Sequence, residues 1–161
     1  MLNRRFLLAH PAHFIALGAG SGLSRFAPGT AGTLWAWAVF LLLQQWLTPL
    51  ELGVLIAAST LVGWWACTVT ARHMGVADPG AIVWDEVIAF WIILWLVTPT
   101  TFGGQLGAFL LFRYFDAAKP GPVAWADKLF KGFGWRGGWG ILFDDLVAAF
   151  CTLLVIALWR F

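Results

Sequence analysis

Long apolar runs separated by short breaks rich in Gly, Pro, Ser and Thr dominate the chain. The breaks that end these runs include Thr48-Pro49, Thr98-Pro99 and Pro120. Apolar runs bounded by such turn signals are typical of buried or membrane helices. We therefore predict five helical segments, at residues 33–47, 50–71, 81–97, 104–118 and 138–159. A helix needs about 20 residues to cross a bilayer, so we expect the first and fourth segments to tilt, to thin the bilayer or to insert only in part.

The composition agrees with a membrane protein. Of the 161 residues, 61% are hydrophobic and 11% are charged, and the mean hydropathy is +0.82. Soluble domains usually have about 25% charged residues. The length fits one domain, so we predict a single all-α, polytopic membrane bundle over residues 1–161. A net charge of +2 without an aromatic–basic stripe gives no support for a nucleic-acid partner.

Positive charges gather on one side of the predicted topology. If all five segments cross the bilayer, the N-terminus and the loops at 72–80 and 119–136 share a side. That side holds Arg4, Arg5, Arg25, Arg72, Lys119, Lys128, Lys131 and Arg136, and the other side holds only Arg160. Because cytoplasmic loops are enriched in Lys and Arg, we expect the basic side to face the cytoplasm.

Five acidic side chains interrupt or border the apolar runs: Asp85, Glu86, Asp116, Asp144 and Asp145. A charged side chain near the bilayer centre costs roughly 2.5–3.5 kcal/mol on insertion scales, so such residues mark functional sites. All five fall at the predicted cytoplasmic end, where they can converge in one layer. Carboxylates in this number need cations, and an oxygen-only ligand set suits Mg²⁺. We predict a metal site with room for one ion or two.

Two further motifs point to phosphate chemistry. In FRYFDAAKP, Arg113, Asp116 and Lys119 lie three residues apart along one helix face. Asp116 could ligate metal while Lys119 offers a charge to a phosphate, with Arg113 as a structural residue; the alternative is a ladder of ion pairs that reaches the membrane interface. The Gly- and hydroxyl-rich stretch at residues 20–33 precedes a helix, whose N-terminus favours an anion. A flexible turn with a Ser or Thr cap is the alternative for this stretch.

Several functional classes remain open at this point. The Cys67–Arg72 spacing does not match a cysteine-phosphatase loop, and no DxDx[TV] motif indicates an aspartyl-phosphate enzyme. Metal-activated water is the simplest nucleophile, although a phospho-aspartate is not excluded. The alternative function is a small membrane cation transporter or channel that uses the acidic cluster as an ion site. A non-catalytic membrane scaffold is a third possibility.

Four of these motifs together resemble bacterial phosphatidylglycerophosphatase A. They are GSGLSRFAPGTAGT (20–33), WDEVIAFWI (84–92), FRYFDAAKP (112–120) and GGWGILFDDLVA (137–148). The resemblance implies an Mg²⁺-dependent enzyme that removes the terminal phosphate of phosphatidylglycerophosphate, giving phosphatidylglycerol. It implies a lipid substrate in the bilayer and a site on the cytoplasmic face of the bacterial inner membrane.

The same resemblance implies roles for individual residues. Catalytic roles fall to Asp85, Glu86, Asp116 and Asp145, metal ligation to these four and Asp144, and phosphate binding to Arg25, Thr30, Thr33 and Lys119. It does not say which acid is the general base.

Overall fold

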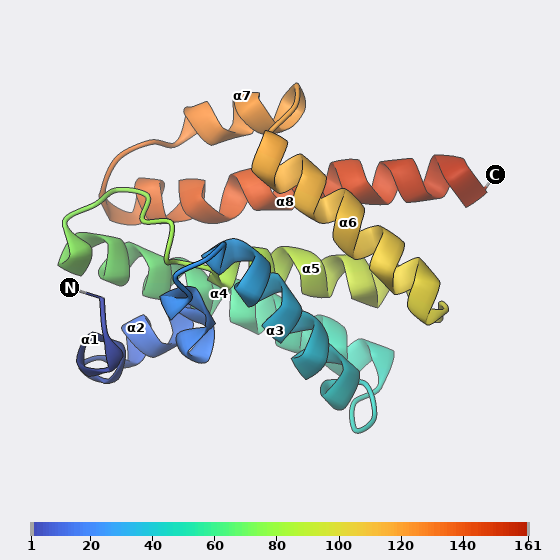
Figure 1. Cartoon of the computed structure of the whole chain (residues 1–161), viewed down its shortest axis with the longest axis horizontal. Coiled ribbons are helices and arrows are strands. Elements are labelled where there is room, and N and C mark those ends of the chain that lie inside the picture. The colour runs from blue at the N-terminus through green and yellow to red at the C-terminus, as the bar shows by residue number, and fades with distance from the viewer. Residues whose placement is uncertain (1, 161) are drawn as a thin grey trace.

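The computed structural model describes residues 2–160 and contains only helices over that range (Figure 1). The elements are α1 (Arg4–Leu8), α2 (Pro11–Ala16), the 3₁₀ element η1 (Gly18–Leu23), α3 (Pro28–Leu43), α4 (Pro49–Met74), α5 (Trp84–Val97), α6 (Phe102–Ala118), α7 (Pro122–Leu129) and α8 (Gly134–Arg160). The all-α prediction is confirmed.

Each of the five predicted segments overlaps one of the five longest helices, and the bounds differ at both ends: α3 ends at Leu43 instead of residue 47, and α4 continues to Met74. α3 begins at Pro28, where the fixed φ of proline suits the first helical position. α5 begins only at Trp84, because the backbone N–H of Val83 donates to the carbonyl of Ala16 in α2 at 2.9 Å. The short elements α1, α2, η1 and α7 lie outside the predicted segments.

Helix α5 lies at the centre of the bundle and contacts α3, α4, α6 and α8. Its buried residues are Glu86, Val87, Ile88, Ala89, Phe90, Trp91, Ile93, Leu94 and Val97, which cover all sides of the helix. A helix that is apolar all round belongs in a core. The acids of its first turn are therefore held at one end of the protein's most buried element.

Two helices are long and apolar enough to cross a membrane, α4 and α8 over Pro49–Met74 and Gly134–Trp159. Only 33% and 39% of their most apolar stretches are buried, and large side chains such as Leu61 and Phe150 are exposed. A core helix of a soluble protein would be mostly buried, so these exposed apolar faces suggest membrane association. With 16, 14 and 17 residues, α3, α5 and α6 are shorter than the roughly 20 residues of a full span. The bundle of five spans stays a prediction.

Candidate metal and phosphate site

All five predicted acids line one pocket of about 210 Å³. The lining residues are Asp78, Pro79, Gly80, Ile82, Asp85, Glu86, Asp116, Lys119, Asp144 and Asp145. The acids come from three helices: the first turn of α5, the last turn of α6 and the first half of α8. Both α5 and α6 pack against α8, which brings segments up to 60 residues apart in the sequence to the same cavity.

Three of the acids form a compact cluster with the chemistry of a cation site. Asp85, Glu86 and Asp145 each offer one carboxylate oxygen, and these oxygens lie within 4.8 Å of one another. The buried atoms Asp85 Oδ1, Glu86 Oε2 and Asp145 Oδ2 have no hydrogen-bond partner within the described residues. Buried polar atoms left unpaired are costly, and converging anionic oxygens are the ligands that a hard divalent cation prefers. The donor set therefore fits a bound metal ion.

The adjacent acids of α8 have different surroundings. Neighbouring residues on a helix point about 100° apart, so one can face α5 while the other faces α6 and α7. Asp145 joins Asp85 and Glu86, whereas Asp144 Oδ2 accepts a hydrogen bond from Lys119 Nζ at 2.6 Å. The Asp-Asp pair thus links the cation cluster to a fixed positive charge.

Arg113 lies among the acids instead of standing apart from them. Its guanidinium is paired with Asp116 one turn along α6, and Nη1 lies 3.9 Å from Glu86 Oε1. The same nitrogen donates to Thr33 Oγ1 at 3.5 Å. The side chain of Arg113 is 18% exposed, so it neutralises two carboxylates in a largely desolvated place. From its place in the motif we expect Arg113 to be structural; in the structure it joins α3, α5 and α6 at the site.

Lys119 lines the same pocket as Asp116 but pairs with other acids. It ends α6 in the left-handed region, with φ of +45°, and its Nζ donates to Asp127 Oδ1 at 2.5 Å as well as to Asp144. Partial burial lowers the pKa of Lys119, but the hydrogen bonds to Asp127 and Asp144 outweigh it and hold that pKa above its usual range. Lys119 therefore remains a cation at neutral pH.

Two further acids lie close to the site: Asp78 lines the pocket, and Asp127 of α7 pairs with Lys119. Lys131 Nζ donates to Asp127 at 3.0 Å and to Asp78 at 3.3 Å, which ties the α4–α5 loop to α7. Partial burial raises the pKa of Asp127, and its hydrogen bonds with Lys119 and Lys131 more than offset that, leaving the pKa below its ordinary value. The pair of Asp127 and Lys131 is suggested by their four-residue spacing, although Lys131 lies two residues beyond the end of α7. The contact of Asp127 with Lys119 is tertiary.

The Gly- and hydroxyl-rich stretch reaches the acids through its backbone. Arg25 is exposed and Thr30 is half-buried, and neither lines the acidic pocket. Thr33 is buried, donates to the carbonyl of Gly29 at 2.8 Å and contacts Arg113. A Cβ atom at Gly29 would overlap Glu86 Oε1 and crowd both terminal nitrogens of Arg113. The first turn of α3 can approach the cluster this closely because residue 29 has no side chain.

The fold and the site together define the class of protein: an α-helical protein with two helices long and apolar enough to cross a membrane, and with a desolvated carboxylate site suited to a divalent cation. A family model described as Phosphatidylglycerophosphatase A matches residues 14–160. The chain belongs to the phosphatidylglycerophosphatase A family, and so is a phosphomonoesterase. The resemblance drawn from the four motifs is confirmed.

Individual relatives agree over most of their length. The chain is 38% identical to phosphatidylglycerophosphatase A of Escherichia coli over 149 residues (89% of this chain, 80% of that protein). It is 35% identical to phosphatidylglycerophosphatase A of Haemophilus influenzae over 153 residues (95% and 91%). It is also 36% identical over 152 residues (91% and 91%) to a Bacteroides thetaiotaomicron protein provisionally named a phosphatidylinositol-3-phosphatase. No solved structure matches the chain.

Proposed function

We propose that this phosphatase cleaves the terminal phosphate of phosphatidylglycerophosphate with Mg²⁺ held by Asp85, Glu86 and Asp145, at the cytoplasmic face of the bacterial inner membrane. Two observations support the metal: Asp85, Glu86 and Asp145 each bring a carboxylate oxygen within 4.8 Å of the others, and each has a buried oxygen without a partner within residues 2–160. The cation Lys119 lines the same pocket, where it can bind a phosphate.

The remaining residues have separable tasks in this proposal. Bound Mg²⁺ would supply Lewis-acid stabilisation of phosphate charge and a more acidic water. Lys119 binds and orients the phosphate as a point charge. Arg113 offsets the charges of Glu86 and Asp116, so that five acids can share a small, partly dry space. Asp116 and Asp144 line the pocket outside the three-acid cluster, and one of them is placed to accept the proton from the attacking water.

The membrane face is inferred from charge and helix direction. The N-terminus, the α4–α5 connection and the start of α8 lie at one end of the protein, and the C-terminus lies at the other (Figure 1). Seven of the eight basic residues predicted to be cytoplasmic lie in the N-terminal segment, in the last turn of α4 or between the end of α6 and the first turn of α8. The positive-inside rule then puts the acidic pocket at headgroup depth on the cytoplasmic side, where a diacyl substrate presents its phosphate.

The first test is phosphate release by the detergent-purified protein. Phosphatidylglycerophosphate, phosphatidic acid and phosphatidylinositol 3-phosphate are compared, each with Mg²⁺, with excess EDTA, and with Mg²⁺ restored. We expect release from phosphatidylglycerophosphate that stops with EDTA and returns with Mg²⁺. Equal release from all three lipids would contradict the substrate, and release that persists in EDTA would contradict the metal. No release from folded, Mg²⁺-supplied protein would favour the cation-transport alternative.

Substitution of Lys119 separates substrate binding from chemistry. We expect Lys119→Ala to raise KM by about tenfold, the equivalent of about 1.4 kcal/mol, with a smaller effect on kcat. The reason is that an ammonium contact to the phosphate exists before and during the reaction. Lys128→Ala is the matched control, because Lys128 is an exposed lysine of the neighbouring helix α7 that does not line the pocket. A selective fall in kcat with unchanged KM would contradict the role given to Lys119.

A further inference from the structure

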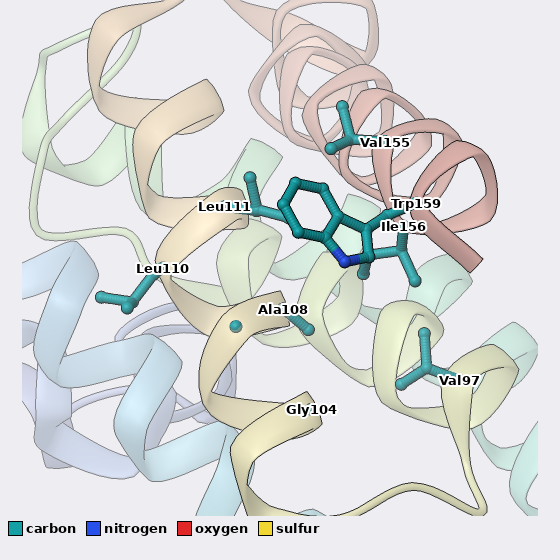
Figure 2. A pocket seen from close by; sticks show the side chains of 9 residues that line it. Val97, Gly104, Ala108, Leu110, Leu111, Val155, Ile156 and Trp159 are labelled. Atoms are coloured by element: carbon teal, nitrogen blue, oxygen red, sulfur yellow. The ribbon is translucent and has the colours of Figure 1, made fainter. Parts of the chain in front are cut away.

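An apolar groove of about 470 Å³ lies between α6, α8 and the end of α5. Its lining residues are Val97, Gly104, Gly107, Ala108, Leu110, Leu111, Val155, Ile156 and Trp159, and none of them is charged. Figure 2 shows the groove bordered by α6 on one side and by the last turns of α8 on the other. Pockets for small ligands are typically about 300–1,000 Å³, so the groove is large enough to hold one.

The groove lies along α5, α6 and α8, the three helices that also carry the five acids. Asp145 and Ile156 are eleven residues apart on α8, which corresponds to about 16 Å at about 1.5 Å per residue. Asp116 and Gly107 are nine residues apart on α6, or about 14 Å by the same rise. The acids lie toward one end of this helix group and the groove toward the other, with a separation of about 14–16 Å along the helices.

We propose that this groove binds one acyl chain of the lipid substrate, an inference that rests on the proposed function. About eleven bonds join the terminal phosphorus of phosphatidylglycerophosphate to the first acyl carbon. At roughly 1.2 Å of advance per bond they span on the order of 13 Å. With the phosphate beside Asp145 and Lys119, the acyl chain therefore begins close to the level of the groove.

The shape of the groove favours an acyl chain over a second copy of the protein. Gly104, Gly107 and Ala108 have little or no side chain, so the wall of the groove that α6 forms is mostly backbone. A Cβ atom at Gly107 would meet nothing within 4 Å. Small residues of this kind also allow helices to pair in membranes. However, a helix with side chains is about 10–12 Å thick, and α6 and α8 already contact each other. A polymethylene chain needs far less width than a helix, which favours the acyl chain as the occupant.

An acyl chain in the groove would act mainly by position. In a bilayer the chain is already in an apolar solvent, so moving it into the groove gains packing and little hydrophobic free energy. Holding the chain fixes the distance and direction from which the headgroup reaches the acids. Such positioning raises the rate by orienting the reacting groups. The groove should therefore favour lipids over the same headgroup without its chains.

The test fills the groove from Gly107. In Gly107→Leu the new side chain starts in open space, and leucine is a better helix former than glycine, so the fold is expected to persist. The control is Gly103→Leu, because Gly103 is an exposed glycine of the same helix outside the groove, and a Cβ there comes no closer than 3.8 Å to another atom. The substrates are dipalmitoyl phosphatidylglycerophosphate and its deacylated headgroup, glycerophosphoglycerophosphate.

We expect Gly107→Leu to lower kcat/KM for the dipalmitoyl lipid by about tenfold, with less than twofold change for the deacylated headgroup and no such difference in Gly103→Leu. Equal effects on both substrates, or no effect on either, would overturn the proposal. A changed oligomeric state of Gly107→Leu in detergent would overturn it in favour of an interface between copies. If the unsubstituted protein hydrolyses the headgroup but gains nothing from the acyl chains, the groove role fails while the proposed function stands. If it hydrolyses neither substrate, the proposed function itself fails.

Discussion

Replacing Asp145 by Asn is expected to reduce phosphate release by about a thousandfold or more while the protein still folds. The substitution keeps the shape of the side chain but removes an anionic oxygen that lies within 4.8 Å of those of Asp85 and Glu86. Binding of a hard cation depends on that charge. Loss of a residue that holds a catalytic metal removes several kcal/mol of transition-state stabilisation. Asp85→Asn is expected to behave in the same way. The measurement is kcat/KM of detergent-purified variants at saturating Mg²⁺.

The fold should survive this change because the cluster is a source of repulsion when no cation is bound. Three carboxylates converge there, and of the three only Glu86 has an ion pair, at 3.9 Å, within the described residues. Neutralising one carboxylate should therefore leave thermal stability in EDTA unchanged or higher, and should abolish any stabilisation by added Mg²⁺. Glu51→Gln is the matched control, since Glu51 is an exposed acid in the first turn of α4, and Gln can keep its capping role. Near-normal activity in both Asp145→Asn and Asp85→Asn would contradict the proposed metal site.

Replacing Arg113 by Met is expected to destabilise the protein by about 3–5 kcal/mol, the usual effect of removing one partner from a buried ion pair. Met retains much of the packing volume but leaves Asp116 and Glu86 without their cation. The hydrogen bond to Thr33 that ties α3 to the site is lost as well. The measurement is the midpoint of thermal unfolding in detergent with EDTA, where a fall of several degrees is expected.

Two comparisons show whether the effect of Arg113→Met comes from charge. Arg136→Met is the control, because Arg136 is exposed and, within the described residues, contacts the carbonyl of Leu129 and the ring of Phe130 but no acid. Adding Glu86→Gln to Arg113→Met should recover part of the lost stability, since one of the two orphaned carboxylates is then neutral. An Arg113→Met protein as stable as the parent would mean that Arg113 does not neutralise the acids. A double variant less stable than the single one would contradict the pairing with Glu86.

The sequence is informative about the helices because each apolar run ends at residues that stop a helix. Pro49 and Pro99 separate consecutive runs, and the observed helices keep to those breaks. The acids are equally conspicuous, since a carboxylate within an apolar run is costly unless a site requires it. Where the prediction differs, as at the start of α5, the cause is a tertiary hydrogen bond between Val83 and Ala16.

Partner choice within the site could not be predicted from spacing alone. Lys119 is three residues after Asp116, which suggests one helix face, yet the left-handed backbone at Lys119 turns it toward Asp127 and Asp144. A Cβ atom at Gly29 would overlap Glu86. This close approach depends on how α3 packs against α5. Such contacts depend on the rotation and crossing of helices, and no local pattern reports them.

The sequence by itself determined that this protein is helical and apolar, that it gathers five acids, and that its motifs match one phosphatase family. These properties follow from residue type and order, because helix formation and the cost of buried charge are local. Only the tertiary structure decided that Asp85, Glu86 and Asp145 converge in one acidic cluster, that Arg113 pairs with acids beside it, and that an apolar groove lies along the same helices. These depend on which helix faces meet, and packing between distant segments sets that.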